Sequence, residues 1–186
     1  MGEGDHASQA RRAWQVLETA ERIHAKADVD RALDRMALAI GDAVGQTDPI
    51  MMVVLHGALV FAGHLLPRLK FPLEVDYVHA TRYRGGLTGG EITWAAGPSL
   101  PVAGRTVVLL DDILDEGVTL AALAETLRAR GAAAVLKAVL VTKTRPRPEG
   151  LEADFSGLEV PDRYVFGWGM DYHGFLRNTK DIYAIP

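Results

Sequence analysis

The sequence contains no cysteine and no long hydrophobic run. Its 186 residues therefore cannot form a disulfide, use a thiolate nucleophile or bind a metal through sulfur. No apolar run approaches the roughly 20 residues that a membrane-spanning helix needs, so we expect no membrane partner. The N-terminus has no apolar core and carries acidic residues early, which is not typical of a signal peptide. We expect a soluble, cytoplasmic protein.

The sequence is also poor in positive charge. It has 20 Lys and Arg against 24 Asp and Glu, which gives a formal net charge of −4. Proteins that bind nucleic acid broadly through its phosphates usually carry a strongly basic face. A short basic cluster, Lys143, Arg145 and Arg147, is interrupted by two prolines and is weak support for such a face. We therefore expect no nucleic-acid partner.

The composition indicates a folded globular protein, because hydrophobic residues make up 48% and charged residues 24% of the chain. The length allows one domain with a sizeable core and is too short for two. Periodic apolar residues predict two helices before residue 45. The first covers about 25 residues, with Trp14, Leu17 and Ala20 on one face. The second begins at Asp28 as N-cap and has an apolar stripe of Val29, Leu33, Met36, Ile40 and Val44.

From Pro49 the pattern changes to short apolar runs that alternate with helical segments. A continuous apolar run of this length is typical of a strand buried on both faces of a parallel sheet. The predicted strands cover residues 50–55, 73–79, 106–110 and 134–141, with weaker ones at 91–94, 164–166 and 182–184; the predicted helices between them cover 59–69 and 119–130. An α/β fold follows, with a parallel sheet covered by helices. In such folds, ligands bind at the carboxyl ends of the strands.

Acidic residues follow the predicted strand at 106–110. The segment 107–120 reads VVLLDDILDEGVTL and contains three carboxylates, Asp111, Asp112 and Asp115. Carboxylates at a strand end can hold ribose hydroxyls or Mg²⁺. The backbone N–H groups of the following helix start, with the Thr119 hydroxyl, can bind a phosphate, and Gly117 permits the tight turn between them. The same residues are also compatible with a strand end followed by a solvated turn.

An acidic pair after a buried strand also occurs in the receiver domains of response regulators. That class needs the pair near the N-terminus and a phosphoacceptor aspartate at the end of a later buried strand. Here the pair stands in mid-chain, and Asp154 follows a loop rich in proline and arginine. The pattern therefore does not favour a receiver domain.

The segment 107–120 resembles the motif that binds phosphoribosyl pyrophosphate (PRPP) in type I phosphoribosyltransferases. That motif is a hydrophobic strand, two acids, two apolar residues, Asp, a small residue, Gly, any residue and Thr. Two positions depart from the family: Glu116 replaces a small or hydroxylated residue, and Val118 stands where many members have Lys. The chain from about Glu21 to Pro186 resembles the hypoxanthine-guanine branch of this family. The resemblance implies a single domain over residues 1–186, with a parallel sheet core flanked by helices and a small hood formed by the N-terminal and C-terminal segments.

The resemblance also implies where PRPP would bind. Its ribose 5-phosphate would contact Asp111, Asp112, Asp115, Glu116, Gly117, Val118 and Thr119. Its pyrophosphate would contact Arg177 and the loop Leu55, His56 and Gly57, in which family members often have a cis peptide that turns a backbone N–H toward the pyrophosphate. His56 stands where the family usually has Lys or Asn, and its side chain is equally compatible with an ordinary turn histidine.

The resemblance implies a lid, a purine pocket and a metal. Arg82 and Tyr83, followed by the glycine-rich RGGLTGG, are similar to the flexible loop that closes over the site, although a surface hairpin has the same composition. Lys143 corresponds to the lysine that hydrogen-bonds the purine 6-oxo group. The other purine residues would be Tyr164, which stacks on the base, Val165, whose backbone reads its edge, and Asp171. The cofactor would be Mg²⁺, with Asp171, Asp111 and Asp112 as candidate ligands.

Tyr164, Phe166 and Trp168 are alternatively compatible with one face of a core strand. Of these, we expect Tyr164 to be partly exposed and Phe166 to be structural, while Trp168 stays open. The family reaction joins hypoxanthine or guanine to the phosphoribosyl group of PRPP, and Asp115 is the candidate general base for the purine N7 proton.

Two alternatives to this activity remain. The first is a xanthine-preferring or broad 6-oxopurine enzyme. The second is a nucleotide-binding regulator that kept the fold, against which the presence of Asp115, Lys143 and Asp171 and the acidic total charge count. Adenine is not expected as a substrate, because Lys143 cannot accept a hydrogen bond from its amino group. The family habit implies a homodimer or a homotetramer.

Overall fold

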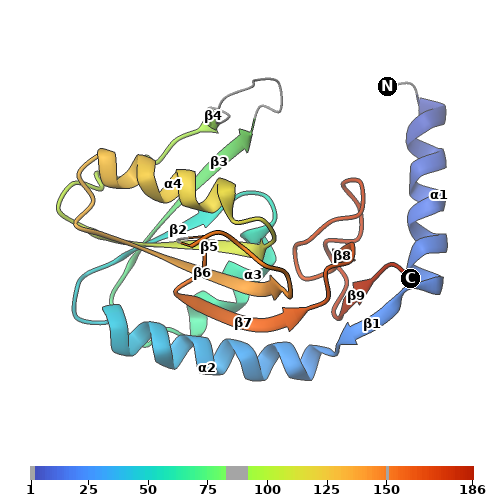
Figure 1. The fold of residues 1–186 in the computed structure, drawn as a ribbon, viewed down its shortest axis with the longest axis horizontal. Helices are drawn as coiled ribbons and strands as arrows, with labels where there is room; N and C mark the ends of the chain where they lie inside the picture. Colours follow the sequence, from blue (N-terminus) through green and yellow to red (C-terminus); the bar gives the residue numbers. More distant parts are fainter. Residues whose placement is uncertain (1–2, 83–91, 150) are drawn as a thin grey trace.

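The computed structural model describes the chain except residues 1–2, 83–91 and 150 (Figure 1). The described helices are α1 (Glu3–Thr19), α2 (Lys26–Val44), α3 (Ala58–Leu65) and α4 (Val118–Ala129), with a short 3-10 turn η1 (Leu66–Arg68). The described strands are β1 (Glu21–His24), β2 (Ile50–Val54), β3 (Glu74–Arg82), β4 (Ile92–Ala96), β5 (Thr106–Leu114), β6 (Ala134–Lys143), β7 (Phe155–Val160), β8 (Val165–Phe166) and β9 (Ile182–Ala184). None of these helices is long and apolar enough to cross a membrane.

The main sheet has the strand order β4-β3-β2-β5-β6-β7. Neighbouring strands from β3 to β7 run parallel, and β4 is antiparallel to β3. The chain passes from β2 to β3 on one side and from β5 to β6 on the other, so the order reverses between β2 and β5. Open α/β sheets bind ligands at the carboxyl ends of the strands beside such a reversal. The predicted α/β fold is confirmed, with β4 as its antiparallel edge.

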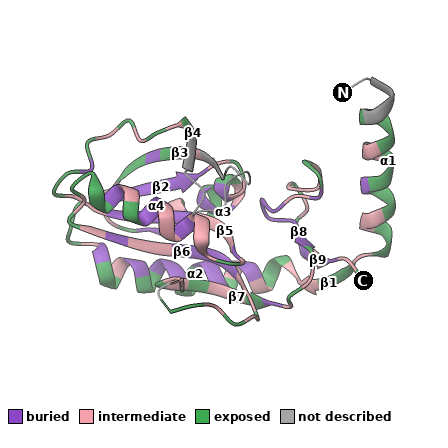
Figure 2. Cartoon of the chain, turned by 45° about the horizontal axis from the view of Figure 1, so that its top comes forward, coloured by how far each residue is buried: buried purple, intermediate pink, exposed green. Residues whose placement is uncertain are grey.

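Helices cover both faces of this sheet (Figure 1): α2 and α3 lie on one face, and α4 lies on the other. Alternating side chains of β2 and β5 face the two helical layers. Met51, Val53, Val108 and Leu110 pack in the cluster with α2 and α3, whereas Ile50, Met52, Val107 and Leu109 pack in the cluster with α4. Figure 2 shows β2 and the apolar part of β5, residues 107–110, as buried. The apolar runs therefore reflect burial on two faces, as predicted.

A second, antiparallel sheet has the order β1-β9-β8 and is formed by both ends of the chain. We call β1, β8, β9 and residues 167–181 the hood. Figure 1 shows the hood beyond the carboxyl ends of the main parallel strands. Helix α1 packs on it through Ala13, which is buried with Phe166 and Tyr172.

The N-terminal region differs from the prediction in two respects. The first helix ends at Thr19, and β1 occupies part of the segment expected to be helical. The buried face of α1 is defined by Ala13 with Val16, Leu17 and Ala20 beside it, while Trp14 is 67% exposed. A helix that contacts its neighbour along only one narrow stripe leaves the adjacent position outside, and Trp14 occupies that position.

Two further differences concern the start of α2 and the strand β7. Helix α2 begins at Lys26, after Ala25, and not at Asp28. Asp28 lies inside the first turn, where its carboxylate accepts a hydrogen bond from the Ala25 N–H at 3.0 Å, which is the reverse half of a capping box. Strand β7 was not predicted, because its sequence FSGLEV shows no regular apolar alternation; it pairs with β6 as the edge of the main sheet.

Candidate active site

Two loops meet where the strand order reverses, one after β2 and one at the end of β5. A cis peptide bond joins Leu55 to His56 in the first loop. The next residue, Gly57, lies against the carboxylate of Asp112, so closely that a Cβ on Gly57 would stand 2.1 Å from Asp112 Oδ2. Position 57 therefore has no room for a side chain while Asp112 keeps this position.

The acidic pair Asp111 and Asp112 lies within β5, which continues to Leu114 and is four residues longer than predicted. The Asp112 N–H donates to Asp111 Oδ1 at 3.0 Å. Burial, followed by the negative charge of Asp112, raises the pKa of Asp111 well above its usual range. Burial also raises the pKa of Asp112, against the opposing effects of the hydrogen bond with Asp111 and the charge of Arg177. Carboxyl groups perturbed in this way are common at functional sites.

The turn after β5 leads directly into the N-terminus of α4. Gly117 is the N-cap residue with φ of 81°, and a Cβ there would stand 2.6 Å from the Leu151 carbonyl oxygen. The first hydrogen bond of the helix runs from the Ala121 N–H to the Gly117 carbonyl at 2.9 Å. The preceding N–H groups of the first turn, including that of Thr119, have no partner within the helix. They form an anion site of the kind that phosphates occupy. Glu116, which departs from the family motif, is exposed.

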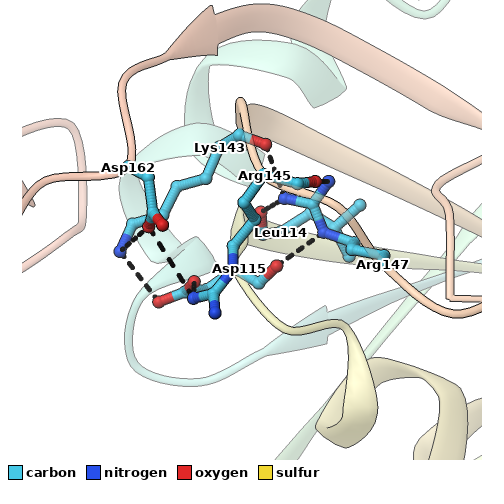
Figure 3. Close-up of polar contacts among 6 residues, drawn as sticks. All are labelled: Leu114, Asp115, Lys143, Arg145, Arg147 and Asp162. Atoms are coloured by element: carbon cyan, nitrogen blue, oxygen red, sulfur yellow. Dashed lines mark hydrogen bonds and ion pairs between the residues drawn. The ribbon is translucent and has the colours of Figure 1, made fainter.

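Asp115 is held by two cations (Figure 3). Lys143 Nζ lies 2.9 Å from Asp115 Oδ2, and Arg145 NH1 lies 2.8 Å from Asp115 Oδ1. A second acid, Asp162, lies 3.8 Å from Lys143 Nζ and 3.7 Å from Arg145 NH1. Partial burial would raise the pKa of Asp115, but the hydrogen bonds from Lys143 and Arg145 outweigh it and hold that pKa below its usual range.

Arg147 joins the ends of β5 and β6 through their main chains (Figure 3). Its guanidinium donates to the carbonyl oxygens of Leu114 at 2.8 Å, Asp115 at 2.5 Å and Lys143 at 2.7 Å. Three bonds from one rigid, planar group fix the relative position of the strand ends that carry Asp115 and Lys143. In the sequence, Arg145 and Arg147 form only a short basic cluster. No local sequence signal distinguishes their roles from those of solvated loop charges, because both contacts depend on how the two strand ends lie in space.

The core and the hood share a pocket of about 190 Å³. Its lining includes Asp112, Asp115, Lys143, Tyr164, Val165 and Asp171. The structure thus brings all four predicted purine residues together with two of the β5 carboxylates. Tyr164 is 47% exposed, and its hydroxyl donates to the Asp171 carbonyl at 3.0 Å. Phe166 and Trp168 are buried, and Trp168 Nε1 donates to the Lys180 carbonyl at 2.6 Å, so both are structural.

Asp171 and Arg177 form an ion pair in the hood, with Arg177 NH2 2.8 Å from Asp171 Oδ1. The other oxygen of Asp171 accepts a hydrogen bond from the Gly174 N–H at 2.7 Å. Within the described part of the chain, no three His, Cys, Asp or Glu side chains stand close enough to bind a metal by themselves. The available carboxylate oxygens fit Mg²⁺ in the way that this ion is usually bound, through one or two carboxylates together with water and substrate phosphates.

The expected flexible loop lies mostly outside the described residues. Arg82 is the last residue of β3, where it pairs with Ile92 of β4, and Tyr83 and the glycine-rich segment after it are not described. His56 is exposed, and its ring centre lies 4.5 Å from that of His79 in an edge-on arrangement.

Comparison with known proteins gives consistent matches. The family model of the phosphoribosyl transferase domain matches residues 19–173. A hypoxanthine-guanine phosphoribosyltransferase from Bacillus subtilis is 31% identical over 156 residues, which is 83% of this chain and 87% of the relative. A hypoxanthine-guanine-xanthine phosphoribosyltransferase from Tritrichomonas foetus is 29% identical over 90% of this chain and 92% of the relative. The crystal structure of a hypoxanthine phosphoribosyltransferase from Staphylococcus aureus matches with a TM-score of 0.83 at 24% identity, over 89% of this chain and 91% of that one.

Proposed function

The chain belongs to the phosphoribosyl transferase domain family, and on that premise we propose that it transfers the 5-phosphoribosyl group of PRPP to hypoxanthine or guanine. The products are IMP or GMP and pyrophosphate. The observation that carries the proposal is the pocket between core and hood, which Lys143 and Asp115 line from the core and Tyr164 lines from the hood. A planar base fits these groups if it has a hydrogen-bond acceptor for Lys143, an N–H proton for Asp115 and a ring face for Tyr164.

PRPP binds along the ends of β2 and β5. Its 5-phosphate accepts hydrogen bonds from the first-turn N–H groups of α4 and from the Thr119 hydroxyl, and its ribose hydroxyls donate to Asp111 and Asp112. The close approach of Gly57 to Asp112 supports a joint site for ribose and pyrophosphate. The pyrophosphate contacts the backbone of the Leu55–Gly57 loop and the guanidinium of Arg177.

The base lies against Tyr164 and donates its N7 proton to Asp115. Lys143 donates to the purine 6-oxo oxygen, and the backbone of Val165 binds the opposite edge. As the bond between the ribose C1 and the pyrophosphate oxygen breaks, negative charge grows on the leaving group, and Arg177 and the loop N–H groups stabilise it. Asp115 has a pKa below its usual range, so it is ionised and able to accept the proton at neutral pH.

Mg²⁺ is the cofactor that these donors fit, with Asp171, Asp111 and Asp112 as candidate ligands. When bound, the ion neutralises charge on the pyrophosphate of PRPP. The ion pair between Arg177 and Asp171 keeps both groups on the same side of the hood. The predicted homodimer or homotetramer and the predicted cytoplasmic location stay predictions.

A broader 6-oxopurine range is the second candidate. One relative, from Tritrichomonas foetus, is named for hypoxanthine, guanine and xanthine and is 29% identical. Lys143 binds the oxygen at position 6, which all three bases share, so it does not select among them.

A PRPP-dependent assay with hypoxanthine, guanine, xanthine and adenine tests the proposal, read as relative kcat/KM. We expect the 6-oxopurines to react and adenine not to react, because Lys143 donates hydrogen bonds and accepts none. Adenine turnover comparable to that of hypoxanthine would overturn the assignment. Nucleotide binding without turnover of any base would instead favour a regulator that kept the fold.

A further inference from the structure

Arg145 is a second cation on the candidate general base. It contacts Asp115 Oδ1 at 2.8 Å, while Lys143 contacts Oδ2 at 2.9 Å (Figure 3). The two cations therefore hold different oxygens of one carboxylate. The family roles that apply to this chain give Lys143 to the purine and assign nothing to Arg145.

Arg145 is itself fixed in place. Its backbone N–H donates to the Lys143 carbonyl at 3.0 Å, and its carbonyl accepts a long hydrogen bond from Arg147 at 3.4 Å. Its guanidinium lies 3.7 Å from Asp162 Oδ1, and 33% of its side chain is exposed. An arginine anchored at its main chain and paired at its tip loses less freedom on binding a carboxylate than a free surface side chain does.

We propose that Arg145 is a positioning residue that holds Oδ1 of Asp115, so that Oδ2 is the oxygen presented to the purine N7 when Lys143 binds the 6-oxo group. This inference rests on the proposed function. In the step itself, the purine N9 lone pair forms the bond to the ribose C1, and the electron pair of the C1–O bond leaves with pyrophosphate. The N7 proton moves to Asp115 Oδ2, and its bonding pair stays in the purine ring.

The charges around Asp115 explain why a second cation matters. Lys143 and Arg145 attract the carboxylate, whereas Asp162, Glu116 and the pocket-lining Asp112 add negative charge nearby, and Arg147 binds only the main-chain oxygen of Asp115. When Lys143 shares its donors with the base, Arg145 is the cation that stays in close contact with the Asp115 carboxylate. It keeps Asp115 ionised, in agreement with the lowered pKa of that group.

The test compares Arg145→Gln with Arg145→Lys. We expect Arg145→Gln to lower kcat/KM for hypoxanthine about 10-fold, a part of the 10²–10⁴-fold that a general base contributes. The acidic limb of the pH profile moves to higher pH, because losing the cation raises the pKa of the base. Arg145→Lys brings both kcat/KM and the acidic limb most of the way back to their wild-type values. The KM for PRPP stays near that of the wild type in both variants. Arg35→Gln, which removes an exposed arginine of α2, is the matched control.

A double-mutant cycle decides whether Arg145 acts through Asp115. If Arg145 acts through Asp115, adding Arg145→Gln to an Asp115→Asn protein lowers kcat/KM for hypoxanthine no further. An equal loss in both backgrounds, or an unmoved acidic limb in a folded Arg145→Gln protein, overturns the inference.

An NMR titration of the Asp115 carboxyl needs no turnover and separates this inference from the proposed function. Arg145→Gln should raise the titration midpoint, and Arg145→Lys should return it. An unchanged midpoint overturns the inference, whereas a raised midpoint in a protein that turns over no base leaves the contact established and refutes the proposed activity.

Discussion

Gly169 of the hood lies directly on the main chain of Gly57 in the core. A Cβ at Gly169 would stand 1.9 Å from the Gly57 carbonyl oxygen, and the φ of Gly169 is 105°. The Gly169 N–H donates to the Arg177 carbonyl at 2.9 Å, and its own carbonyl accepts from Arg177 NH1 at 2.6 Å. Contact between two glycines thus links the position of the Leu55–Gly57 loop to that of Arg177.

Gly169→Ala should therefore damage both stability and PRPP binding. Gly174→Ala is the matched control, because Gly174 also has a positive φ, 88°, but a Cβ added there would meet no atom within 4 Å. The control measures the loss of stability that comes from placing a side chain on a left-handed backbone alone, which is about 1–2 kcal/mol. We expect a larger loss for Gly169→Ala in thermal unfolding, with a raised KM for PRPP. Equal losses in the two variants would show that the glycine contact is not tight.

Asp115→Asn should lower kcat and leave PRPP affinity nearly unchanged. The amide keeps the size of the side chain but cannot accept the N7 proton, so kcat falls by about 10²–10⁴-fold. Steady-state kinetics and PRPP titration measure the two effects separately. Retention of more than about half of the wild-type kcat, far outside that range, would remove Asp115 from the general-base role.

Thr119→Val should have the opposite result. It removes a hydroxyl from the proposed 5-phosphate site, and a hydrogen bond to a charged group is worth about 1.5–3 kcal/mol. PRPP binding weakens accordingly, while kcat at saturating PRPP stays near the wild-type value. A Thr119→Val protein with unchanged PRPP affinity would contradict the proposed phosphate site.

Asp111→Asn should stabilise the protein at neutral pH while weakening PRPP binding. Folding raises the pKa of Asp111, so the folded state binds this proton more tightly than the unfolded state does. The resulting stabilisation is fully present below the unfolded pKa, about 3.9, and is lost as the pH rises through the raised folded value. Above it, the partly buried negative charge opposes folding.

Thermal unfolding of wild type and Asp111→Asn between pH 4 and 8, in metal-free buffer, measures this effect. We expect the variant to melt higher at neutral pH and the difference to shrink toward pH 4, since burial is the main cause of the shift. Asp42→Asn, on the exposed side of α2, is the matched control. An Asp111→Asn protein that melts lower than wild type at pH 7 would refute the expectation.

Tyr164→Ala should raise the KM for the purine and spare PRPP. Stacking of a base on an aromatic ring is worth about 1–3 kcal/mol. Tyr164→Phe keeps the ring and loses only the hydrogen bond to the Asp171 carbonyl, so its purine KM should stay close to the wild-type value. Equal effects of the two substitutions would assign the role to the hydroxyl and not to the ring.

Activity should require Mg²⁺ or Mn²⁺ and disappear with EDTA. The candidate donors are carboxylate oxygens, which these hard cations prefer. The assay is PRPP-dependent nucleotide formation before and after chelation, with readdition of the ion as control. Full activity after the divalent ions are stripped would exclude a metal role for Asp171.

The central strands could be predicted from the sequence because burial on two faces requires a continuous run of apolar residues. The runs at 50–54 and 107–110 are wholly apolar, and the acids after the second run lie where strand ends meet. Strands β1 and β7 contain no such apolar run. They are exposed on one side, short or irregular, and carry polar residues such as Glu21 and Glu159. Their positions depend on partners far away in the chain.

Single residues of the site could be predicted from the sequence, whereas most contacts between them could not. The local sequence and its resemblance to the family identified the acids of β5 and the residues Lys143 and Tyr164, and Asp112, Asp115, Lys143 and Tyr164 line one pocket. The pairing of Arg145 with Asp115 and the clamp made by Arg147 depend on the relative position of two strand ends. Local sequence does not encode that distance, because charged side chains in a loop are usually solvated.

The central strand of the hood sheet is β9, residues 182–184, which joins β1 to β8. During synthesis, all strands of the main sheet have been made by residue 160, whereas the hood sheet gains its central strand only with residues 182–184. A nascent chain can therefore contain every strand of its main sheet while the hood, which carries Tyr164 and Asp171, still lacks its central strand. Removal of residues 182–184 should accordingly disrupt the hood side of the pocket, although every strand of the main sheet is retained.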